Sequence, residues 1–197
     1  MAASDRERWD AKYADKPVPD QFSPDEWLIE QVAGLPPGRA LELACGLGHN
    51  AIWLALDGWQ VDAVDISPTG LARAEDLAAR HGARVNWIAA DLDEFNPEST
   101  AYDLVLVFRF LDRGQLPGAI QRALRPGGRL INETFTMAHL ARPDSHMKNP
   151  AFVLEPGELP RLFPQLDVLS YAECSLADRD VARLVAAMPV LPETANP

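Results

Sequence analysis

The sequence predicts an α/β fold in which helices cover both faces of a doubly wound, mostly parallel sheet. Three observations indicate this fold. Short apolar runs alternate with helical patterns between residues 39 and 134. The run at residues 104–108 is nearly continuous in apolar residues, which is typical of a strand covered on both faces. Two later runs are joined by a short polar turn, which predicts a hairpin and one antiparallel edge strand.

Two capping-box patterns begin helices ahead of the sheet. The first is Ser-Asp-Arg-Glu at residues 4–7, and its helix carries Trp9 and Tyr13 on one face. The second is Ser-Pro-Asp-Glu at residues 23–26, with proline expected at the first helical position, and its helix runs to about Val32. We expect a single domain, 1–197, made of an N-terminal helical lid at 1–34, a sheet core at 35–188 and a tail at 189–197.

The strand–helix alternation defines the sheet. Each predicted strand is a short apolar run bounded by turn residues, at residues 39–43, 60–64, 85–89, 104–108 and 129–134. Helices connect these strands at residues 50–57, from Ser67 to Gly82, and from Asp112 onward with Leu116, Ile120 and Leu124 in register.

The pattern changes after the fifth strand. Residues 136–150 are polar and irregular, residues 158–163 predict a short helix, and the hairpin strands lie at 166–173 and 181–188. Because the irregular stretch follows the fifth strand, we expect it to form a mobile wall of the functional site. Phe135, Met137 and Met147 would line a soft, apolar pocket there.

The charge and composition of the chain exclude several classes of binding partner. The 197 residues hold 18 Lys+Arg against 29 Asp+Glu, a formal net charge of −11. The sequence has no basic footprint that would release counterions from a nucleic acid, and no basic cluster or long apolar run that would hold a membrane. No apolar leader is visible, and two cysteines make neither a disulfide framework nor a structural zinc site. We therefore expect a cytoplasmic protein without nucleic-acid, membrane or metal partners, of undetermined oligomeric state.

The loop after the first strand, residues 44–48, is a candidate ligand site, because open parallel sheets bind ligands at the carboxyl ends of their strands. Gly46 and Gly48 let the backbone turn tightly and approach a ligand closely. A dinucleotide fingerprint would place glycine or alanine at residue 51, and alanine stands there. Glu42, however, would repel a pyrophosphate. The same carboxylate suits an ammonium or sulfonium ligand, and S-adenosylmethionine carries both groups.

Two more carboxylates follow the next strands. Asp65 lies close to the spacing from Gly48 at which an acid chelates both ribose hydroxyls. Capping of the next helix is the alternative role, but Ser67 already serves as that cap. Asp91 closes the third strand where it suits an adenine amino group, with the Leu92 N–H facing a ring nitrogen. An ordinary loop aspartate is the alternative for Asp91.

These residues resemble those of class I S-adenosylmethionine-dependent methyltransferases, and the resemblance runs from about Arg6 to Met188. Within the class, the chain is most similar to the small tellurite-resistance and thiopurine methyltransferase-type enzymes. The C-G-x-G-R-N…L-A signature of the tellurite-resistance group appears at residues 45–55, with His49 in place of arginine. The block at residues 152–159 also resembles a late block of that group.

The resemblance implies a seven-stranded Rossmann-like sheet of order 3-2-1-4-5-7-6 with strand 7 antiparallel, in agreement with the hairpin. It also implies S-adenosylmethionine as cofactor, S-adenosylhomocysteine as product and a small-molecule methyl acceptor. Glu42 would lie beneath the amino group and Phe108 near the sulfonium, while the first helix would fold over the cofactor. The implied cofactor-binding residues are Trp9, Tyr13, Glu42, Ala44, Gly46, Gly48, Asn50, Asp65, Ile66, Asp91, Leu92 and Phe108.

The acceptor-side candidates are few. Methyl transfer from a sulfonium is an in-line displacement, so positioning and desolvation supply most of the rate. A soft sulfur, selenium or tellurium nucleophile needs no strong base, whereas an oxygen or amine acceptor usually needs one. Arg109 could hold an anionic acceptor by bidentate hydrogen bonds, and pairing with Asp112 is the alternative. Glu133 is the candidate base with His139 beyond it, and a structural or solvent-exposed role is the alternative for each.

Two other functions stay open on the sequence. An NAD(P)-dependent oxidoreductase would use the same glycine-bearing loop, and Glu42 argues against it. A non-catalytic, cofactor-binding regulatory subunit would have no accessible acceptor cavity over the sulfonium position. A closed or flat surface there would therefore favour the regulatory subunit.

Overall fold

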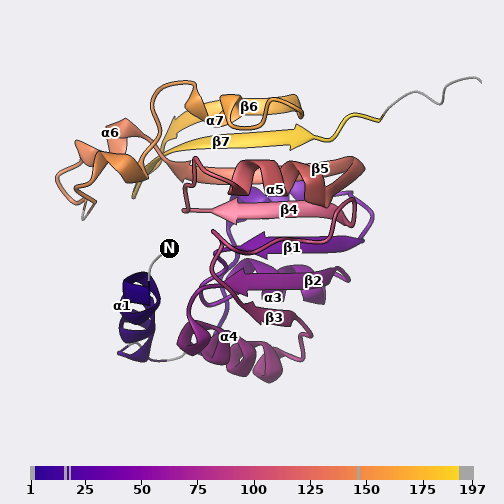
Figure 1. The fold of residues 1–197 in the computed structure, drawn as a ribbon. Coiled ribbons are helices and arrows are strands. Elements are labelled where there is room, and N and C mark those ends of the chain that lie inside the picture. Colours follow the sequence, from indigo (N-terminus) through magenta and orange to yellow (C-terminus); the bar gives the residue numbers. More distant parts are fainter. Residues whose placement is uncertain (1–2, 16, 18, 146, 191–197) are drawn as a thin grey trace, which may run out of the picture.

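The computed structural model describes residues 3–15, 17, 19–145 and 147–190. This part of the chain contains a seven-stranded sheet of order β3-β2-β1-β4-β5-β7-β6 (Figure 1). The strands are β1 Arg39–Leu43, β2 Gln60–Asp65, β3 Asn86–Ala89, β4 Tyr102–Phe108, β5 Leu124–Phe135, β6 Asp167–Ser175 and β7 Asp180–Ala187. Neighbouring strands pair in parallel except β7, which is antiparallel to both β5 and β6. The predicted fold class, strand order and C-terminal hairpin are confirmed.

The helices follow the predicted alternation. They are α1 Ala3–Ala14, α2 Glu26–Val32, α3 His49–Leu56, α4 Pro68–His81, α5 Leu116–Ala123, α6 Met137–Leu140 and α7 Glu158–Arg161, with a 3₁₀ turn η1 at Pro150–Phe152. Among these described helices, none is long and apolar enough to cross a membrane.

Successive strand residues turn their side chains to two core layers. Leu41 and Val105 pack in one layer with α5 and α7. Their neighbours Ala40 and Leu104 pack in the other layer with α2 and α3. α4 lies beside α3 through a smaller cluster. Helices therefore cover both faces of the sheet, as the apolar run at residues 104–108 predicts.

β1 lies where the strand order reverses, because β2 pairs with one side of it and β4 with the other. The loops that leave the carboxyl ends of these strands diverge and create a crevice, which is the usual ligand site of such sheets. α1 and α6 lie beyond this end of the sheet (Figure 1). The loop after β1 is therefore at the crevice.

The start of α2 differs from the prediction. Asp25 is the N-cap, and its side chain accepts a hydrogen bond from the Trp27 N–H at 3.1 Å. Pro24 therefore precedes the helix and does not occupy its first turn. An aspartate with extended backbone can receive this N–H, which a capping serine two residues earlier could not reach.

The helix predicted from Asp112 is shorter than expected. The Asp112 side chain accepts hydrogen bonds from the N–H groups of Gly114 and Leu116, but the helix itself begins only at Leu116. It ends before Leu124, which instead pairs with Tyr102 as the first residue of β5. A register shift follows, so the Pro-Gly-Gly segment at 126–128 lies within the long strand.

Residues 136–150 are more regular than their polarity predicts. They contain the short helix α6, and the turn η1 begins at Pro150. An isolated parallel bridge between Thr136 and Leu154 holds the two ends of the segment together. Most of the predicted tail, residues 191–197, lies outside the described residues.

Candidate functional site

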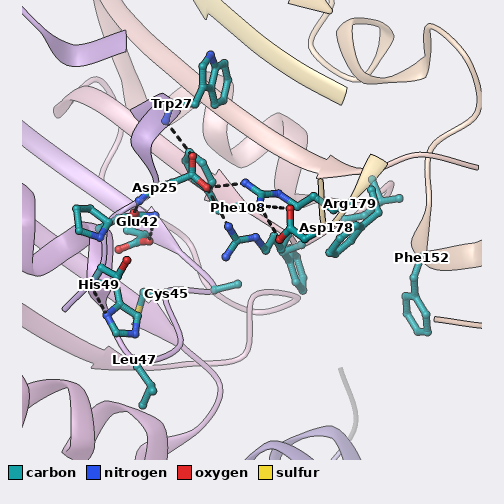
Figure 2. A pocket seen from close by; sticks show the side chains of 18 of the residues that line it. Asp25, Trp27, Glu42, Cys45, Leu47, His49, Phe108, Phe152, Asp178 and Arg179 are labelled. Atoms are coloured by element: carbon teal, nitrogen blue, oxygen red, sulfur yellow. Dashed lines mark hydrogen bonds and ion pairs between the residues drawn. The ribbon is translucent and has the colours of Figure 1, made fainter. Parts of the chain in front are cut away.

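A large cavity opens at the carboxyl end of the sheet. Its volume is about 1420 Å³, which exceeds the ~300–1,000 Å³ of most small-molecule pockets. Its walls come from α1, from the start of α2, from the loops after β1 and β4, and from the turn before β7 (Figure 2). The cavity can therefore accommodate more than one small molecule.

The loop after β1 has the tight geometry that its glycines predict. Ala44, Gly46 and Gly48 have left-handed φ angles of 56°, 56° and 67°. A Cβ atom at Gly48 would clash with the Trp87 ring, and one at Gly46 would lie 2.7 Å from the Tyr13 hydroxyl. A larger residue at either glycine would therefore strain the backbone and force the facing ring to shift. Ala44 holds the same backbone conformation without the freedom of glycine, a strain that clusters at ligand sites.

Glu42 lines the cavity at the end of β1 and is only 3% exposed. Its Oε1 accepts a hydrogen bond from Asn50 Nδ2 at 3.1 Å, and its Oε2 accepts one from the Ala51 N–H at 2.9 Å. Burial raises the pKa of the Glu42 carboxyl to about 8, and the two hydrogen bonds oppose that rise. Within the described part of the chain, no Lys or Arg side chain pairs with this carboxyl. The cavity therefore presents a buried acid without a cationic partner.

The first turn of α3 ties this loop to the segment before α2. Asn50 Oδ1 accepts a hydrogen bond from the Asp25 N–H at 2.9 Å, and His49 Nδ1 accepts one from the Ser23 N–H at 3.1 Å. Burial and then the charge of Arg109 lower the pKa of His49, which favours a neutral ring with Nδ1 as acceptor. Both side chains therefore fix the loop through the backbone of a neighbouring segment.

Asp65 stands behind the loop instead of in the cavity wall. It is 7% exposed, and its carboxylate accepts hydrogen bonds from the Gly46 N–H at 2.8 Å and the Ser67 N–H at 3.0 Å. Burial raises the pKa of the carboxyl, and the hydrogen bonds oppose the rise. Ser67 Oγ accepts from the Gly70 N–H at 3.0 Å, so Ser67 is the helix cap, as predicted. Each Asp65 oxygen retains acceptor capacity for a ligand hydroxyl.

The predicted cofactor residues fall into two groups. Asp91 accepts a hydrogen bond from the Asp93 N–H at 3.0 Å, while the side chains of Ile66 and Leu92 are buried. The residues that line the cavity are Trp9, Tyr13, Glu42, Ala44, Asn50 and Phe108. Those outside its lining are Gly46, Gly48, Asp65, Ile66, Asp91 and Leu92. The cavity thus includes part of the predicted methionine side of the site, while both glycines and the predicted adenosine side lie outside its lining.

α1 lies between these two groups. Asp10 accepts hydrogen bonds from Ser67 Oγ at 2.5 Å and from the Thr69 N–H at 3.1 Å, at the start of α4. The rings of Trp9 and Tyr13 stack with centroids 5.7 Å apart. The Tyr13 side chain in turn lies against Gly46. The first helix is therefore fastened over the loop after β1.

An arginine network, composed of Asp25, Arg109, Glu133, Arg179 and Arg183, forms another part of the site. Arg179 donates hydrogen bonds to Asp25 and to Glu133, both at 3.0 Å. Arg183 donates to Glu133 at 2.8 Å, and Arg109 donates to Asp25 at 2.9 Å. Figure 2 shows the Arg179 side chain reaching Asp25 close to Phe108. The network joins α2, β4, β5 and β7 at the carboxyl end of the sheet.

Glu133 is not placed as the base that the sequence predicts. Its side chain is fully buried, its Oε1 accepts from Arg179 and its Oε2 accepts from Arg183. It does not line the cavity. Glu133 therefore fixes two arginines and cannot reach an acceptor, so the structural alternative describes it better. Arg109 does line the cavity, and its ion pair is with Asp25 rather than with Asp112.

The segment after β5 contributes differently from the prediction. The ring of His139 stacks on Phe135 with centroids 4.5 Å apart, and its Nδ1 accepts from the Asp180 N–H at 3.4 Å. His139 is therefore turned away from the cavity, and His146 lies outside the described residues. Phe135 and Met147 line the cavity as predicted, joined by Phe152, but Met137 does not.

Sequence reasoning missed Asp25, Arg179 and Arg183 as parts of the site. The sequence does contain one indication of this network. Arg183 interrupts an otherwise apolar predicted strand, and a charged residue there needs a buried partner. Asp25 had been counted only as part of a helix-start pattern. Its contacts with arginines distant in the sequence follow from strand order, which motif spacing does not reveal.

Comparison with known proteins agrees with this architecture. The family profile described as "Methyltransferase domain" matches residues 40–128. The crystal structure of TehB from Haemophilus influenzae superposes with a TM-score of 0.70 at 18% identity, covering 91% of this chain and 67% of that chain. Residues 40–128 therefore form a class I S-adenosylmethionine-dependent methyltransferase domain. A structure described as "Conversion of a Disulfide Bond into a Thioacetal Group during Echinomycin Biosynthesis" gives a TM-score of 0.75 at 21% identity, covering 93% and 91% of the two chains.

Curated relatives extend the comparison to sequence. "Hemagglutinin 1" from Eikenella corrodens is 34% identical over 151 residues, which is 74% of this chain and 49% of that protein. The probable S-adenosyl-L-methionine-dependent methyltransferase TehB of Haemophilus influenzae is 23% identical over 150 residues, 74% of this chain and 52% of that protein. The chain therefore spans about half the length of these curated relatives, and its similarity to TehB is distant.

Proposed function

We propose that this chain transfers a methyl group from S-adenosylmethionine to a small-molecule acceptor. One observation carries the proposal: Glu42 is buried in the cavity without a cationic partner among the described residues. Burial keeps a carboxyl of this kind largely protonated unless a cation stabilises its charged form. The ammonium group of S-adenosylmethionine would supply that cation, whereas the pyrophosphate of NAD(P) would be repelled.

The remaining donor contacts follow the carboxyl ends of β1, β2 and β3. The loop after β1, with Ala44, Gly46, Gly48 and the Asn50 that orients Glu42, would hold the methionine part. Asp65 would accept hydrogen bonds from the ribose hydroxyls beside Ile66, while Asp91 and the Leu92 backbone would bind adenine. Phe108 would face the sulfonium. The free acceptor capacity of Asp65 and the closeness of Glu42 to the loop support this assignment.

We also propose that α1 acts as a lid over the donor, with Trp9 and Tyr13 on its inner face. Tyr13 lies against Gly46, and Asp10 fastens the helix to the start of α4. A nucleoside that reaches Asp65 must therefore pass α1. Closure would exclude water from the methyl group, which favours displacement over hydrolysis.

The chemistry that the cavity supports is a direct displacement. The donor sulfonium supplies an electrophilic methyl group. Arg109 and Phe108 would position the acceptor in line with it, and no base is required if the acceptor is a soft sulfur, selenium or tellurium nucleophile. The burial of Glu133 and the orientation of His139 leave both away from the acceptor, which favours the soft class. The thioacetal-forming structural neighbour is named for chemistry at sulfur, which is in keeping with this choice.

The test is a screen for S-adenosylhomocysteine formation with purified protein, S-adenosylmethionine and matched acceptors. Arylthiols and selenols should be methylated, while the corresponding phenols and anilines should react at least ~100-fold more slowly, since a positioned base typically contributes 10²–10⁴-fold. Faster transfer to the phenol or aniline would refute the soft-acceptor assignment. Formation of no S-adenosylhomocysteine with any acceptor would contradict methyl transfer itself.

The regulatory-subunit alternative makes a different prediction. A non-catalytic subunit would bind the donor without presenting an acceptor cavity. The volume of about 1420 Å³ and its open aromatic and arginine-lined wall favour an enzyme.

A further inference from the structure

The arginine network carries more positive charge than its buried partners neutralise. Three guanidinium groups, those of Arg109, Arg179 and Arg183, meet two buried carboxylates, whose side chains are 6% exposed at Asp25 and 0% exposed at Glu133. Asp178 also pairs with Arg179, but its side chain is 70% exposed, so solvent screens it. Arg179 and Arg183 balance the two buried carboxylates, so the additional positive charge of the network lies on Arg109, whose half-exposed side chain lines the cavity.

Hydrogen-bond donors remain unused at two of these arginines. Arg109 donates to Asp25 through Nη2, and Arg183 donates to Glu133 through Nε. Within the described residues, no acceptor pairs with Nη1 of Arg109 or with either Nη atom of Arg183. Both side chains line the cavity, and both approach Glu133, with Arg109 Nε at 3.9 Å and Arg183 Nε at 2.8 Å. The two guanidinium groups therefore lie beside the same buried carboxylate, and both side chains line one cavity.

The backbone at Arg109 is strained. Its φ angle is 58°, a left-handed value that glycine adopts readily and arginine does not. The Arg109 N–H donates to the Glu133 carbonyl at 2.7 Å, which holds the residue in this conformation. Strain of this kind persists where the surrounding structure enforces it, and it clusters at functional sites. The side chain is half exposed, so its position does not stabilise the core.

Aromatic groups stand beside the free donors. The guanidinium of Arg183 lies 4.9 Å from the centroid of the Trp27 ring, and Trp27 and Phe108 have centroids 6.0 Å apart. Phe135 and Phe152 line the same cavity. Solvent-exposed carboxylates also line it, at Glu26, Glu30, Asp93 and Asp178. These carboxylates disfavour a polyanion such as a nucleotide, while the aromatic walls favour an apolar, planar body.

We propose that the methyl acceptor is an aromatic compound that carries one anionic group besides its nucleophile, and that Arg109 and Arg183 bind this group. The inference rests on the proposed methyl transfer and specifies its substrate class. The acceptor thiolate forms a bond to the methyl carbon, the bond between that carbon and the donor sulfur breaks, and its electron pair stays on the donor, which becomes the neutral thioether. The distant carboxylate of the acceptor is unchanged and stays between the two guanidinium groups.

The probe pair is 4-mercaptophenylacetate and 4-mercaptophenylacetamide. A methylene group insulates the thiol from the differing ends, so the two thiols have similar nucleophilicity while only one molecule is a carboxylate. We expect kcat/KM for the acid to exceed that for the amide by about 10- to 100-fold, as for a charge-assisted hydrogen-bond pair. In Arg109→Gly, which suits the left-handed backbone and so keeps the fold, the acid should react no faster than the amide.

Controls separate this inference from the proposed function. Arg122→Gln removes an equal charge from the exposed surface of α5 and should keep the preference for the acid. Calorimetry with S-adenosylhomocysteine should give the wild-type affinity in Arg109→Gly. If that affinity falls as much as the acid's kcat/KM, the guanidinium holds the donor carboxylate and the inference is wrong. Three other results would also overturn the inference: equal wild-type kcat/KM for the acid and the amide, a preference for the acid that survives in Arg109→Gly, and donor binding without methylation of either thiol. Failure of the wild type to bind S-adenosylhomocysteine would instead overturn the proposed function.

Discussion

Glu42 is the residue whose chemistry distinguishes this site from a dinucleotide site. Its carboxyl is buried, and from the described residues it receives two neutral hydrogen bonds, from Asn50 and the Ala51 N–H. Its pKa of about 8, raised chiefly by burial, means that much of it is protonated at neutral pH. An ammonium beside it would favour the charged form and lower that pKa. Binding of the donor should therefore be linked to proton release.

This linkage can be measured with the variant Glu42→Gln. At pH 7, binding of S-adenosylhomocysteine to the wild type should release a substantial fraction of a proton, because the pKa falls from about 8 to below neutrality in the complex. The variant should release none and bind about 1–3 kcal/mol more weakly. Calorimetry in two buffers with different ionisation enthalpies gives the proton count. A wild-type count of zero would show that Glu42 does not face the ligand ammonium.

At the residue scale, the residues that could be predicted from the sequence are those that belong to local motifs. Strand ends and glycine spacing predicted that Glu42, Gly46, Gly48 and Asp65 lie near one another, and the Asp65 carboxylate does accept a hydrogen bond from the Gly46 N–H. The arginine network was not found, since its members come from four elements and only the folded sheet brings them together. Glu133 was assigned a catalytic role because its partners could not be known from its own strand.

At the scale of elements, α1 is the part whose position bears most on function. It is fastened to α4 by Asp10 and by the Arg73 guanidinium, which donates to the Ala14 carbonyl at 2.8 Å. The capping pattern at residues 4–7 predicted a helix here, but α1 already begins at Ala3, so Ser4 lies inside the helix and is not its cap. The placement of Trp9 and Tyr13 on one face predicted the surface that it turns inward. The shorter α5 and the Asp25 cap of α2 were mispredicted, because several nearby residues could begin each helix.

The lid can be tested by loosening its attachment. Asp10→Ala removes the acceptor of the Ser67 and Thr69 hydrogen bonds while leaving the inner face of α1 intact. A hydrogen bond to a charged group contributes about 1.5–3 kcal/mol, so the dissociation rate constant of S-adenosylhomocysteine should rise roughly tenfold or more. Stopped-flow displacement measures it. Glu7→Ala, an exposed position on the same helix, is the matched control, and equal rates in all three proteins would contradict the lid.

At the scale of the whole molecule, one charged cluster joins four strands away from the cavity. Asp62 on β2 accepts hydrogen bonds from the Arg39 side chain at 3.0 Å, from Asn86 Nδ2 at 2.7 Å and from the Tyr102 hydroxyl at 2.8 Å. These residues lie on β1, β3 and β4. Burial acts to raise the pKa of Asp62, but the three hydrogen-bond donors together hold it below its ordinary value. The cluster therefore stabilises the sheet while the site occupies its other end.

Asp62→Asn should reduce the free energy of unfolding at pH 7 by about 1–3 kcal/mol, because charged hydrogen bonds are lost in a half-buried setting. Since the folded-state pKa of Asp62 is lowered, its contribution is complete above the ordinary pKa near 3.8 and disappears as the pH falls through the folded value. Urea unfolding at pH 7 and near pH 3 should therefore show a cost that shrinks in acid. A cost that is the same at both pH values would exclude a charge-dependent contribution.

Part of the net charge of −11 comes from carboxylates near the proposed donor site. Glu42, Asp65 and Asp91 lie along strand ends where a cationic, phosphate-free nucleoside would bind. The arginine network then gives the acceptor side a local positive charge within an acidic protein. Strand order could be predicted from sequence, but the arginine network at the same end of the sheet as these carboxylates required the structure.

The central claim is that the site binds an S-adenosyl nucleoside through Glu42 and Asp65, and calorimetric titration with S-adenosylhomocysteine tests it most directly. We predict one site per chain, and a loss of about 1.5–3 kcal/mol of binding free energy in Asp65→Ala, which removes the acceptor proposed for the ribose hydroxyls. NADH should give no comparable heat. Absence of binding by the wild type, unchanged affinity in Asp65→Ala, or tighter binding of NADH would contradict the account.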